Sequence, residues 1–437
     1  MEPSSKRAKV SAPATPAIAA SAIPVPEALL AALSTYPTLH ALHTAFTTVP
    51  LPPNLLSLAT AAREATFPHL QAPVTAQQYN PIYACASICV AFATLNISMA
   101  REDKAKALRA VDLAVLRAGA GWGAVAEPLV RLASIANDTP VPSQLPPIPS
   151  HPLPPSYLTN TPHATPIPRI DARSLTPASF RDLYMTSSPV ILAHAIAHWP
   201  ALRKWRDLDY LKAAAGDRLV PVETYDKKDA AQTYLTESWQ QEVMPLGEYI
   251  ADFFKRGEQG ESDRRGYLAQ HQLFDQIPTL RDDIATPAFC VPTAEDTNAP
   301  SACENAATPI VSAWLGPGGT VSPLHNDPYH NLLAQVVGRK YVRVYEVGET
   351  ARLYPREGPL CNNSLVNLDD GDWEKFPRAK EAPFSQCVLE AGEVLYIPKL
   401  AWHYVRGLEP SFSVSFWWGA KMALAKKAGE DNYSAVY

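Results

Sequence analysis

Proline is distributed so unevenly along this chain that it divides the sequence into separate parts. The chain has 437 residues and 43 prolines, about twice the average usage of about 5%. Eleven of these prolines lie between Asp138 and Arg169. Each proline fixes its own φ and lacks a backbone N–H, so this stretch favours neither a regular helix nor a central strand. We expect residues 139–169 to be a semi-extended linker with few packed contacts on either side, with a docking site for a proline-binding domain as the alternative.

Two segments precede this linker. Residues 1–25 are rich in Ala, Pro and Ser and have few large apolar side chains, which predicts a disordered tail. Lys6, Arg7 and Lys9 form a basic cluster there, which is either a nuclear import signal or a solvated tail. The expected location is the nucleus, the cytoplasm or both.

Residues 26–138 have a different texture. Apolar residues, mainly Ala and Leu, recur three and four positions apart, which predicts an all-α module. The expected helices are Glu27–Leu33, Leu55–Ala65, Ile82–Leu95, Lys104–Ala118 and Val125–Ala136.

Beyond the linker, the sequence consists of short β-type runs separated by Gly, Pro and Asn clusters, which predicts a barrel or sandwich. The expected strands are Val190–Leu192, Leu219–Glu223, Tyr267–Gln270, Ile310–Leu315, Leu332–Val337, Lys340–Tyr345, Val394–Ile397, Tyr404–Arg406 and Phe412–Trp418. Helices are expected near Pro177–Met185, Trp205–Ala215, Leu246–Lys255 and Asp372–Arg378. Gly338-Arg339 is expected to form a tight hairpin between the two runs that flank it.

Charge and cysteine content restrict the function classes. The net charge is −5 at pH 7, so the molecule as a whole lacks the basic character of nucleic-acid-binding proteins, and direct nucleic-acid binding is not expected. No apolar run reaches the roughly 18 residues that a membrane helix needs, so membrane association is not expected either. The cysteines are scattered without a disulfide framework and indicate a reducing compartment; they are Cys85, Cys89, Cys290, Cys303, Cys361 and Cys387.

His325 and Asp327 form the most specific local feature of the sequence. Residues two apart in an extended segment point to the same face, so the imidazole and the carboxylate can chelate one ion. Pro323 and Pro328 flank them, which predicts a strand end or loop. His403 begins another β-type run and is the candidate third ligand. Two histidines and one carboxylate suit non-haem Fe(II) and also zinc, but His-x-Asp alone is more often a surface pair.

The sequence around these residues resembles the Jumonji-C (JmjC) family of 2-oxoglutarate- and Fe(II)-dependent oxygenases. The blocks that carry the resemblance are YLAQHQLFDQIP at 267–278, WLGPGGTVSPLHND at 314–327, NLLAQVVGRK at 331–340, EVLYIP at 393–398, WHYVR at 402–406 and SFSVSFWW at 411–418. The resemblance covers roughly residues 170–419.

The resemblance implies a fold and a cofactor. The expected fold is α+β and multi-domain: the all-α module is followed, at residues 170–437, by a JmjC catalytic domain built as a double-stranded β-helix, or cupin barrel, with flanking helices. Fe(II) is implied as the metal, with 2-oxoglutarate and O₂ as co-substrates. The implied site residues are His325, Asp327 and His403 as metal ligands, Lys340 as the partner of the C5 carboxylate, Tyr267, Ser322 and Asn331 as hydrogen-bond donors to the co-substrate, and Trp417 against the wall of the metal site.

The resemblance also implies a protein or peptide substrate. It implies hydroxylation of an arginine side chain at C3, with demethylation of methyl-lysine in histone tails, and so a chromatin role, as the alternative. A cationic side chain favours a carboxylate and an aromatic face, and Glu223 and Trp239 match family positions near the substrate. The stretch Thr224–Leu235 between them is longer than the family pattern, and His330 is expected behind the ligands or on the surface.

Two other function classes remain open on the sequence. One is a non-catalytic JmjC protein that serves as a docking platform. The other is a zinc-dependent hydrolase or isomerase of the cupin type.

Overall fold

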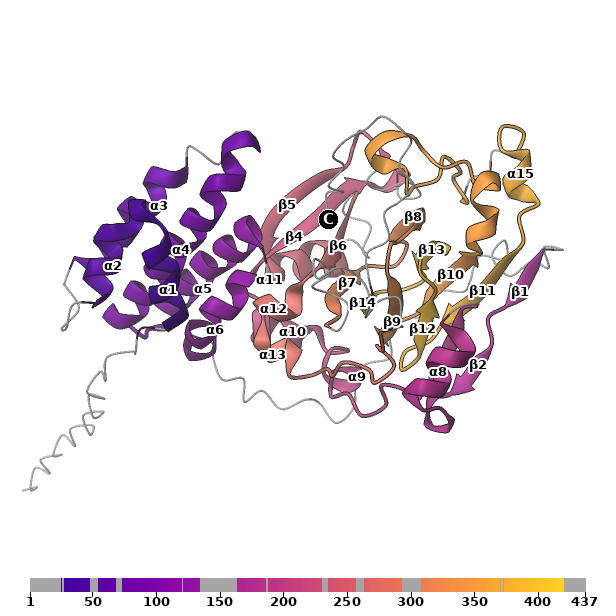
Figure 1. Ribbon diagram of the computed structural model, residues 1–437, viewed down its shortest axis with the longest axis horizontal. Helices are drawn as coiled ribbons and strands as arrows, with labels where there is room; N and C mark the ends of the chain where they lie inside the picture. The colour runs from indigo at the N-terminus through magenta and orange to yellow at the C-terminus, as the bar shows by residue number, and fades with distance from the viewer. Residues whose placement is uncertain are drawn as a thin grey trace, which may run out of the picture.

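The computed structural model describes residues 25, 27–47, 54–67, 73–119, 121–133, 163–185, 188–229, 235–256, 263–292, 308–369, 371 and 373–419. The predicted disordered tail before Val25, most of the proline-rich linker and Cys303 lie outside these residues. A helical body and a larger β-rich body lie side by side, and α5 and α6 of the first face β4, α12 and α13 of the second (Figure 1).

The N-terminal body is helical, as the spacing of its apolar residues predicts. Its elements are α1 (Glu27–Thr35), η1 (Pro37–Leu39), α2 (His40–Thr47), α3 (Leu55–Thr66), α4 (Pro73–Ile97), α5 (Arg101–Ala118) and α6 (Gly121–Ala133). The helix α2 was not predicted, because its eight residues are too few for a clear periodic pattern. All five cysteines among the described residues are free thiols.

The helix α4 corrects one expectation about membranes. Its segment Asn80–Ile97 is long and apolar enough to cross a membrane by length and composition, and 72% of it is buried inside the protein. The expectation that no run reaches this length was wrong. The burial has a packing reason, because α3, α5 and α6 all contact α4, which makes it the central helix of the helical body.

The C-terminal body contains two packed sheets, as expected for a cupin barrel. The smaller sheet has the order β1-β11-β10-β13-β8 and the larger has the order β2-β3-β12-β9-β14-β7-β6-β4-β5. The strands are β1 (Ala164–Pro166), β2 (Arg169–Asp171), β3 (Val190–Ala193), β4 (Leu219–Asp226), β5 (Gln240–Pro245), β6 (Arg264–His271), β7 (Ile310–Gly316), β8 (Val321–Asn326), β9 (His330–Val337), β10 (Lys340–Tyr345), β11 (Phe384–Leu389), β12 (Val394–Ile397), β13 (Trp402–Gly407) and β14 (Ser411–Trp418).

Helical segments cover the outer faces of these sheets. They are η3 (Ala172–Ser174), α8 (Pro177–Tyr184), α9 (Ala201–Lys204), α10 (Leu208–Ala215), η4 (Lys227–Asp229), α11 (Leu246–Ile250), η6 (Ala251–Arg256), α12 (Leu273–Gln276), α13 (Pro278–Arg281), η7 (Val347–Arg352), η8 (Gly358–Leu360) and α15 (Pro377–Lys380). The helix α8 begins with a capping box, in which Thr176 and Ser179 exchange hydrogen bonds and so satisfy N–H groups that lack a partner within the helix.

Alternation along β12 shows how the barrel interior is built. Val394 and Tyr396 belong to the core between the larger sheet and its helices, whereas Leu395 and Ile397 belong to a second core between the two sheets. A strand buried on both faces has no polar side, which explains the continuous apolar run. By the same parity, Lys340 on β10 shares a face with Val342 of the inter-sheet core, so its side chain points into the barrel.

The predicted end of the linker at Arg169 was wrong. Residues Ala164–Pro166 form β1, which pairs in parallel with β11, and Arg169–Asp171 form β2, which pairs in parallel with β3. Between them, Ile167 is 2% exposed and belongs to the inter-sheet core. Prolines are tolerated here because β1 and β2 are edge strands of their sheets. The β-rich body therefore begins at or before His163.

The predicted hairpin at Gly338-Arg339 was also wrong. The strand β9 pairs with β12 and β14 in the larger sheet, whereas β10 pairs with β11 and β13 in the smaller one. The turn carries the chain from one sheet to the other. Gly338 has φ +72°, and a Cβ at this position would lie 2.2 Å from the carbonyl oxygen of Pro410, so the close approach requires glycine.

A buried polar network joins the helical body to the barrel. Asp112 of α5 is fully buried and accepts hydrogen bonds from Arg218 Nε at 2.9 Å, from Gln276 Nε2 at 2.7 Å and from the backbone N–H of Leu219 at 2.8 Å. Gln276 also bonds His271 at 2.6 Å, at the end of β6. The expectation of few packed contacts between the two halves was therefore wrong.

Candidate metal centre

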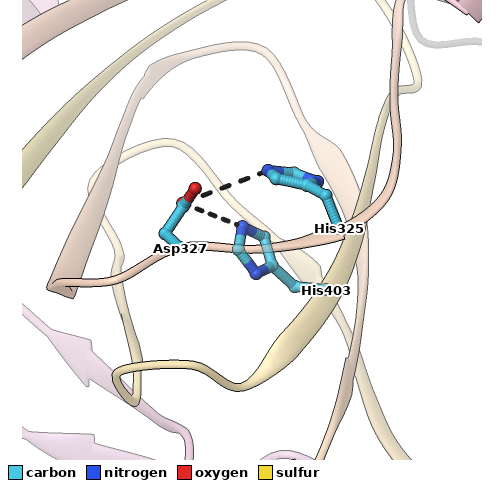
Figure 2. Close-up of side chains that lie close together, drawn as sticks. All are labelled: His325, Asp327 and His403. Carbon is cyan, nitrogen blue, oxygen red and sulfur yellow. Dashed lines mark ion pairs between the residues drawn. The ribbon is translucent and has the colours of Figure 1, made fainter. Parts of the chain in front are cut away.

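Three side chains from two neighbouring strands converge inside the barrel. His325 lies on β8 and His403 on β13, directly opposite each other in the antiparallel ladder, and their ring centroids are 4.2 Å apart. Asp327 follows β8, and its Oδ2 lies 3.5 Å from His403 Nε2 and 4.0 Å from His325 Nε2. One candidate ligand atom from each residue lies within 4.8 Å of the others (Figure 2). The structure thus brings together the three ligands that the sequence singled out.

Hydrogen bonds assign the tautomer of each histidine. His325 Nδ1 lies 2.6 Å from the carbonyl oxygen of Pro323, and His403 Nδ1 lies 3.0 Å from that of Ala401. A carbonyl oxygen only accepts, so each Nδ1 carries the hydrogen and each Nε2 presents a lone pair toward the cluster. This arrangement fixes both ring orientations in the manner typical of metal-binding histidines.

Burial and charge also prepare the cluster for a cation. Burial, together with the neighbouring His403, lowers the pKa of His325 to about 4, so this imidazole is neutral at pH 7. Burial acts to raise the pKa of Asp327, but the neighbouring His403 and His325 favour its ionised form, and the pKa is lowered overall. Two imidazoles that turn Nε2 toward one carboxylate are the donor set that suits a divalent transition metal.

A second group of predicted residues lies deeper in the barrel. Lys340 is 1% exposed, and its Nζ lies 3.3 Å from the hydroxyl of Tyr267. Ser322 is buried and hydrogen-bonds the same tyrosine. Burial lowers the pKa of Lys340 to about 7. Among the described residues no carboxylate pairs with this ammonium, so the site fits a ligand that brings its own negative charge.

Asn331 and Trp417 lie on the larger sheet, where they are direct cross-strand partners on β9 and β14. Both are buried, and Trp417 stacks on Tyr329 with ring centroids 6.0 Å apart. The side-chain oxygen of Asn331 is buried without a hydrogen-bond partner among the described residues. A buried polar atom of this kind is explained by a ligand or a water.

The two candidate substrate residues are close to this group. Glu223 on β4 is the cross-strand partner of Tyr267 on β6. Burial raises the pKa of Glu223 to about 7, and the neighbouring Trp239 indole opposes the shift. Trp239 is half-buried and directly precedes β5. The structure therefore places Glu223 next to Tyr267 and Trp239 next to Glu223, despite the long intervening stretch.

His330 lies in the core, and one segment beside the cluster is marked by no sequence motif. His330 is buried, so the surface interpretation was wrong; its Nδ1 lies 2.8 Å from the hydroxyl of Tyr396, which donates to the carbonyl of Met185. The missed segment is Asn362–Ser364, which pairs with the free edge of β8 beside His325. No motif marks it, because its contacts are made mainly by backbone groups.

Comparison with known families matches residues 176–423 to the cupin-like domain. The chain therefore belongs to the cupin-like domain family. Within it, the chain is 46% identical over 239 residues to lysine-specific demethylase JMJ30 of Arabidopsis thaliana, which covers 54% of this chain and 51% of that protein. The predicted JmjC membership is thereby confirmed.

Two further relatives agree. Lysine-specific demethylase 8 of Xenopus tropicalis is 44% identical over 58% of this chain and 53% of its own length. Jumonji C domain-containing protein 5 of Drosophila melanogaster, the type of JmjC protein that the sequence motifs resemble most, is 40% identical over 58% of this chain and 59% of its own. The chain thus spans between half and three fifths of the length of the curated relatives it matches.

Proposed function

We propose that this protein is an Fe(II)- and 2-oxoglutarate-dependent oxygenase that oxidises a side chain of a protein or peptide. The observation that carries the proposal is the combination of an open three-ligand cluster with the buried, carboxylate-free ammonium of Lys340 in the same barrel. A zinc hydrolase needs the ligands but has no use for a buried cation behind them. A docking protein needs neither.

Each residue has a distinct role in this proposal. His325, His403 and Asp327 would be the protein ligands of the metal. Lys340 and the Tyr267 hydroxyl hold the C5 carboxylate of 2-oxoglutarate, and Ser322 and Asn331 supply further hydrogen bonds. Trp417 closes the wall beside Asn331. Bound iron, with 2-oxoglutarate and O₂, supplies the oxidising power that converts a substrate C–H into C–OH and releases succinate and CO₂.

Demethylation of methyl-lysine is the reaction that the relatives favour, because two of those compared above are named lysine-specific demethylases. Hydroxylation of an N-methyl group gives a carbinolamine, which releases formaldehyde and leaves the demethylated amine. Glu223 supplies the counter-charge for the substrate cation, and Trp239 supplies the aromatic face that suits a methylated ammonium.

Arginine hydroxylation at C3 is the second candidate, and Glu223 favours it. A carboxylate can accept two parallel hydrogen bonds from a guanidinium, which a fully methylated ammonium cannot donate. Both candidates use the same metal centre, so the position of the substrate carbon decides the product.

An activity assay with two kinds of peptide distinguishes demethylation from arginine hydroxylation. The full chain is loaded with Fe(II) under anaerobic conditions and given 2-oxoglutarate, O₂ and either a methyl-lysine or an arginine peptide. Succinate and formaldehyde are measured, with mass spectrometry of the peptide; loss of a methyl group supports demethylation and gain of one oxygen on arginine supports hydroxylation. Succinate formation no higher than that of the His403→Ala variant would refute the oxygenase function.

A further inference from the structure

We infer that Asn362 is a positioning residue that fixes the geometry of the His325–Asp327 chelate. The inference rests on the proposed metal role of His325, Asp327 and His403. Asn326 is the last residue of β8 and lies between the candidate ligands His325 and Asp327. Its backbone N–H donates to the carbonyl of Asn362 at 2.9 Å, and its carbonyl accepts from Asn362 Nδ2 at 3.2 Å.

This arrangement matters because β8 is the last strand of the smaller sheet. One edge of β8 pairs with β13, and the other would be open to slippage without a partner. The segment Asn362–Ser364 supplies that partner: Asn363 forms a bridge with His325, and the N–H of Ser364 donates to the carbonyl of Leu324 at 2.8 Å. The backbone pairing ends at Asn362. The carbonyl of Asn326, the last one before Asp327, therefore depends on the Asn362 side chain for its hydrogen bond.

Neighbouring hydrogen bonds orient that side chain. Asn363 is 3% exposed, and its Nδ2 donates to Asn362 Oδ1 at 2.9 Å. The Oδ1 of Asn362 is therefore occupied, which directs its Nδ2 toward Asn326. Ser364 holds the C-terminal end of the segment, because its hydroxyl donates to the carbonyl of Leu353 at 2.5 Å.

The opposite side of Asp327 is also held. Its carbonyl accepts from the N–H of Leu400 at 2.9 Å. Leu400 has φ +63°, a left-handed conformation that is strained for a non-glycine residue and persists only where the surroundings hold it. The backbone around the ligand pair is thus clamped from two loops. Loss of either clamp would let Asp327 move relative to His325.

The expected effect is on metal affinity rather than on stability. Residues that orient metal ligands typically contribute about 10–100-fold to metal affinity. Asn362 is half-buried on a loop, and removal of its amide group leaves the strand pairing of Ser364 intact. We expect Asn362→Leu, which keeps the size and removes the amide, to weaken metal binding at least about tenfold.

The test uses the metal-free full chain and Mn²⁺ as an air-stable probe. Isothermal titration calorimetry measures the Mn²⁺ dissociation constant for the wild type, Asn362→Leu, Asn363→Asp and Leu365→Ala, and urea denaturation measures stability. Leu365 is 44% exposed on the same loop and serves as the matched control. The expected result is a clear loss of affinity for Asn362→Leu, a smaller loss for Asn363→Asp and no change for Leu365→Ala, with urea midpoints of Asn362→Leu and Leu365→Ala similar to that of the wild type.

Two outcomes would overturn the inference. One is a Mn²⁺ affinity of Asn362→Leu within twofold of the wild type. The other is an equal loss in Leu365→Ala, which would indicate general loosening of the loop; if Asn362→Leu fails to fold, unchanged affinity of Asn363→Asp decides against the inference. His403→Ala separates the two proposals, because undiminished Mn²⁺ binding by that variant would refute the metal site itself.

Discussion

The buried carboxylate of Asp112 should be the most consequential single charge outside the metal site. Asp112→Ala removes the partner of Arg218, whose side chain is 4% exposed, and leaves a guanidinium buried without its counter-charge. It also removes the acceptor for the N–H of Leu219 and for Gln276 Nε2. Breaking a buried ion pair from one side typically costs about 3–5 kcal/mol. Against a typical total of about 5–15 kcal/mol, this is a large fraction of the stability.

Urea denaturation followed by circular dichroism measures this cost. The matched control is Glu102→Ala on the same helix, because Glu102 pairs with Lys106 and the two side chains are 81% and 59% exposed. An exposed pair is screened by solvent and contributes little, so the control should change the midpoint little. The double variant Asp112→Leu with Arg218→Met removes both charges and should be more stable than Asp112→Ala. A cost for Asp112→Ala no larger than that for Glu102→Ala would refute the reasoning.

Three other changes test the catalytic site. His403→Ala should abolish succinate formation while circular dichroism stays unchanged, since the ligand does not support the core; near-normal succinate release would refute the metal assignment. Lys340→Ala should raise the 2-oxoglutarate requirement at least about a hundredfold, because a loss of about 3 kcal/mol or more is expected at a buried pair; an unchanged half-saturation point would transfer the role to another cation. In the wild type that requirement should rise with pH above neutrality, because Lys340, whose pKa is lowered to about 7, loses its proton there. Glu223→Gln should flatten the pH dependence of peptide KM: the pKa of Glu223 is raised to about 7, so wild-type KM for a cationic peptide falls as the carboxyl ionises, and an equal slope in the variant would exclude Glu223 from the substrate site.

The first residue of a truncated chain should decide whether the β-rich body folds without the helical body. A protein that begins at Ile170 lacks β1 and the core residue Ile167, and we expect it to aggregate. One that begins at His163 keeps both and gives Arg218 access to water, which lowers the cost of losing Asp112. Comparison of the soluble yield of the two truncations tests this reasoning; equal yields would show that β1 is dispensable.

Sequence patterns predicted β9, β12 and β14, which are rich in apolar residues and are buried along their whole length. These patterns missed strands in which polar residues or proline interrupt the apolar pattern. The strand β8 contains Pro323 and the candidate ligand His325, and β5 is an edge strand with the polar sequence QQEVMP. Local alternation cannot reveal such strands, because their pairing depends on neighbours that are distant in the sequence.

The residues of the candidate site also fall into two groups, those that could be predicted from the sequence and those that could not. The chelating pair His325 and Asp327 could be found because its spacing is local, and motif resemblance extended the set to Lys340 and Asn331. Asp112 and Asn362 could not be found: one is an acidic residue within a helical pattern and the other lies in an irregular loop. Each acquires its role only from partners that the fold brings close, Arg218 in one case and Asn326 in the other.

The residues proposed to bind 2-oxoglutarate lie on opposite sheets, so the distance between the sheets should limit the length of the ligand that fits. Lys340 extends from the smaller sheet, whereas Tyr267 and Asn331 extend from the larger one. Leu333, Val342 and other side chains of the inter-sheet core keep these walls apart, and such a close-packed layer resists both compression and expansion. A dicarboxylate one methylene longer than 2-oxoglutarate would have to push the sheets apart. If the proposed function holds, discrimination between dicarboxylic acids of different chain length depends on the aliphatic layer that sets the distance between the sheets.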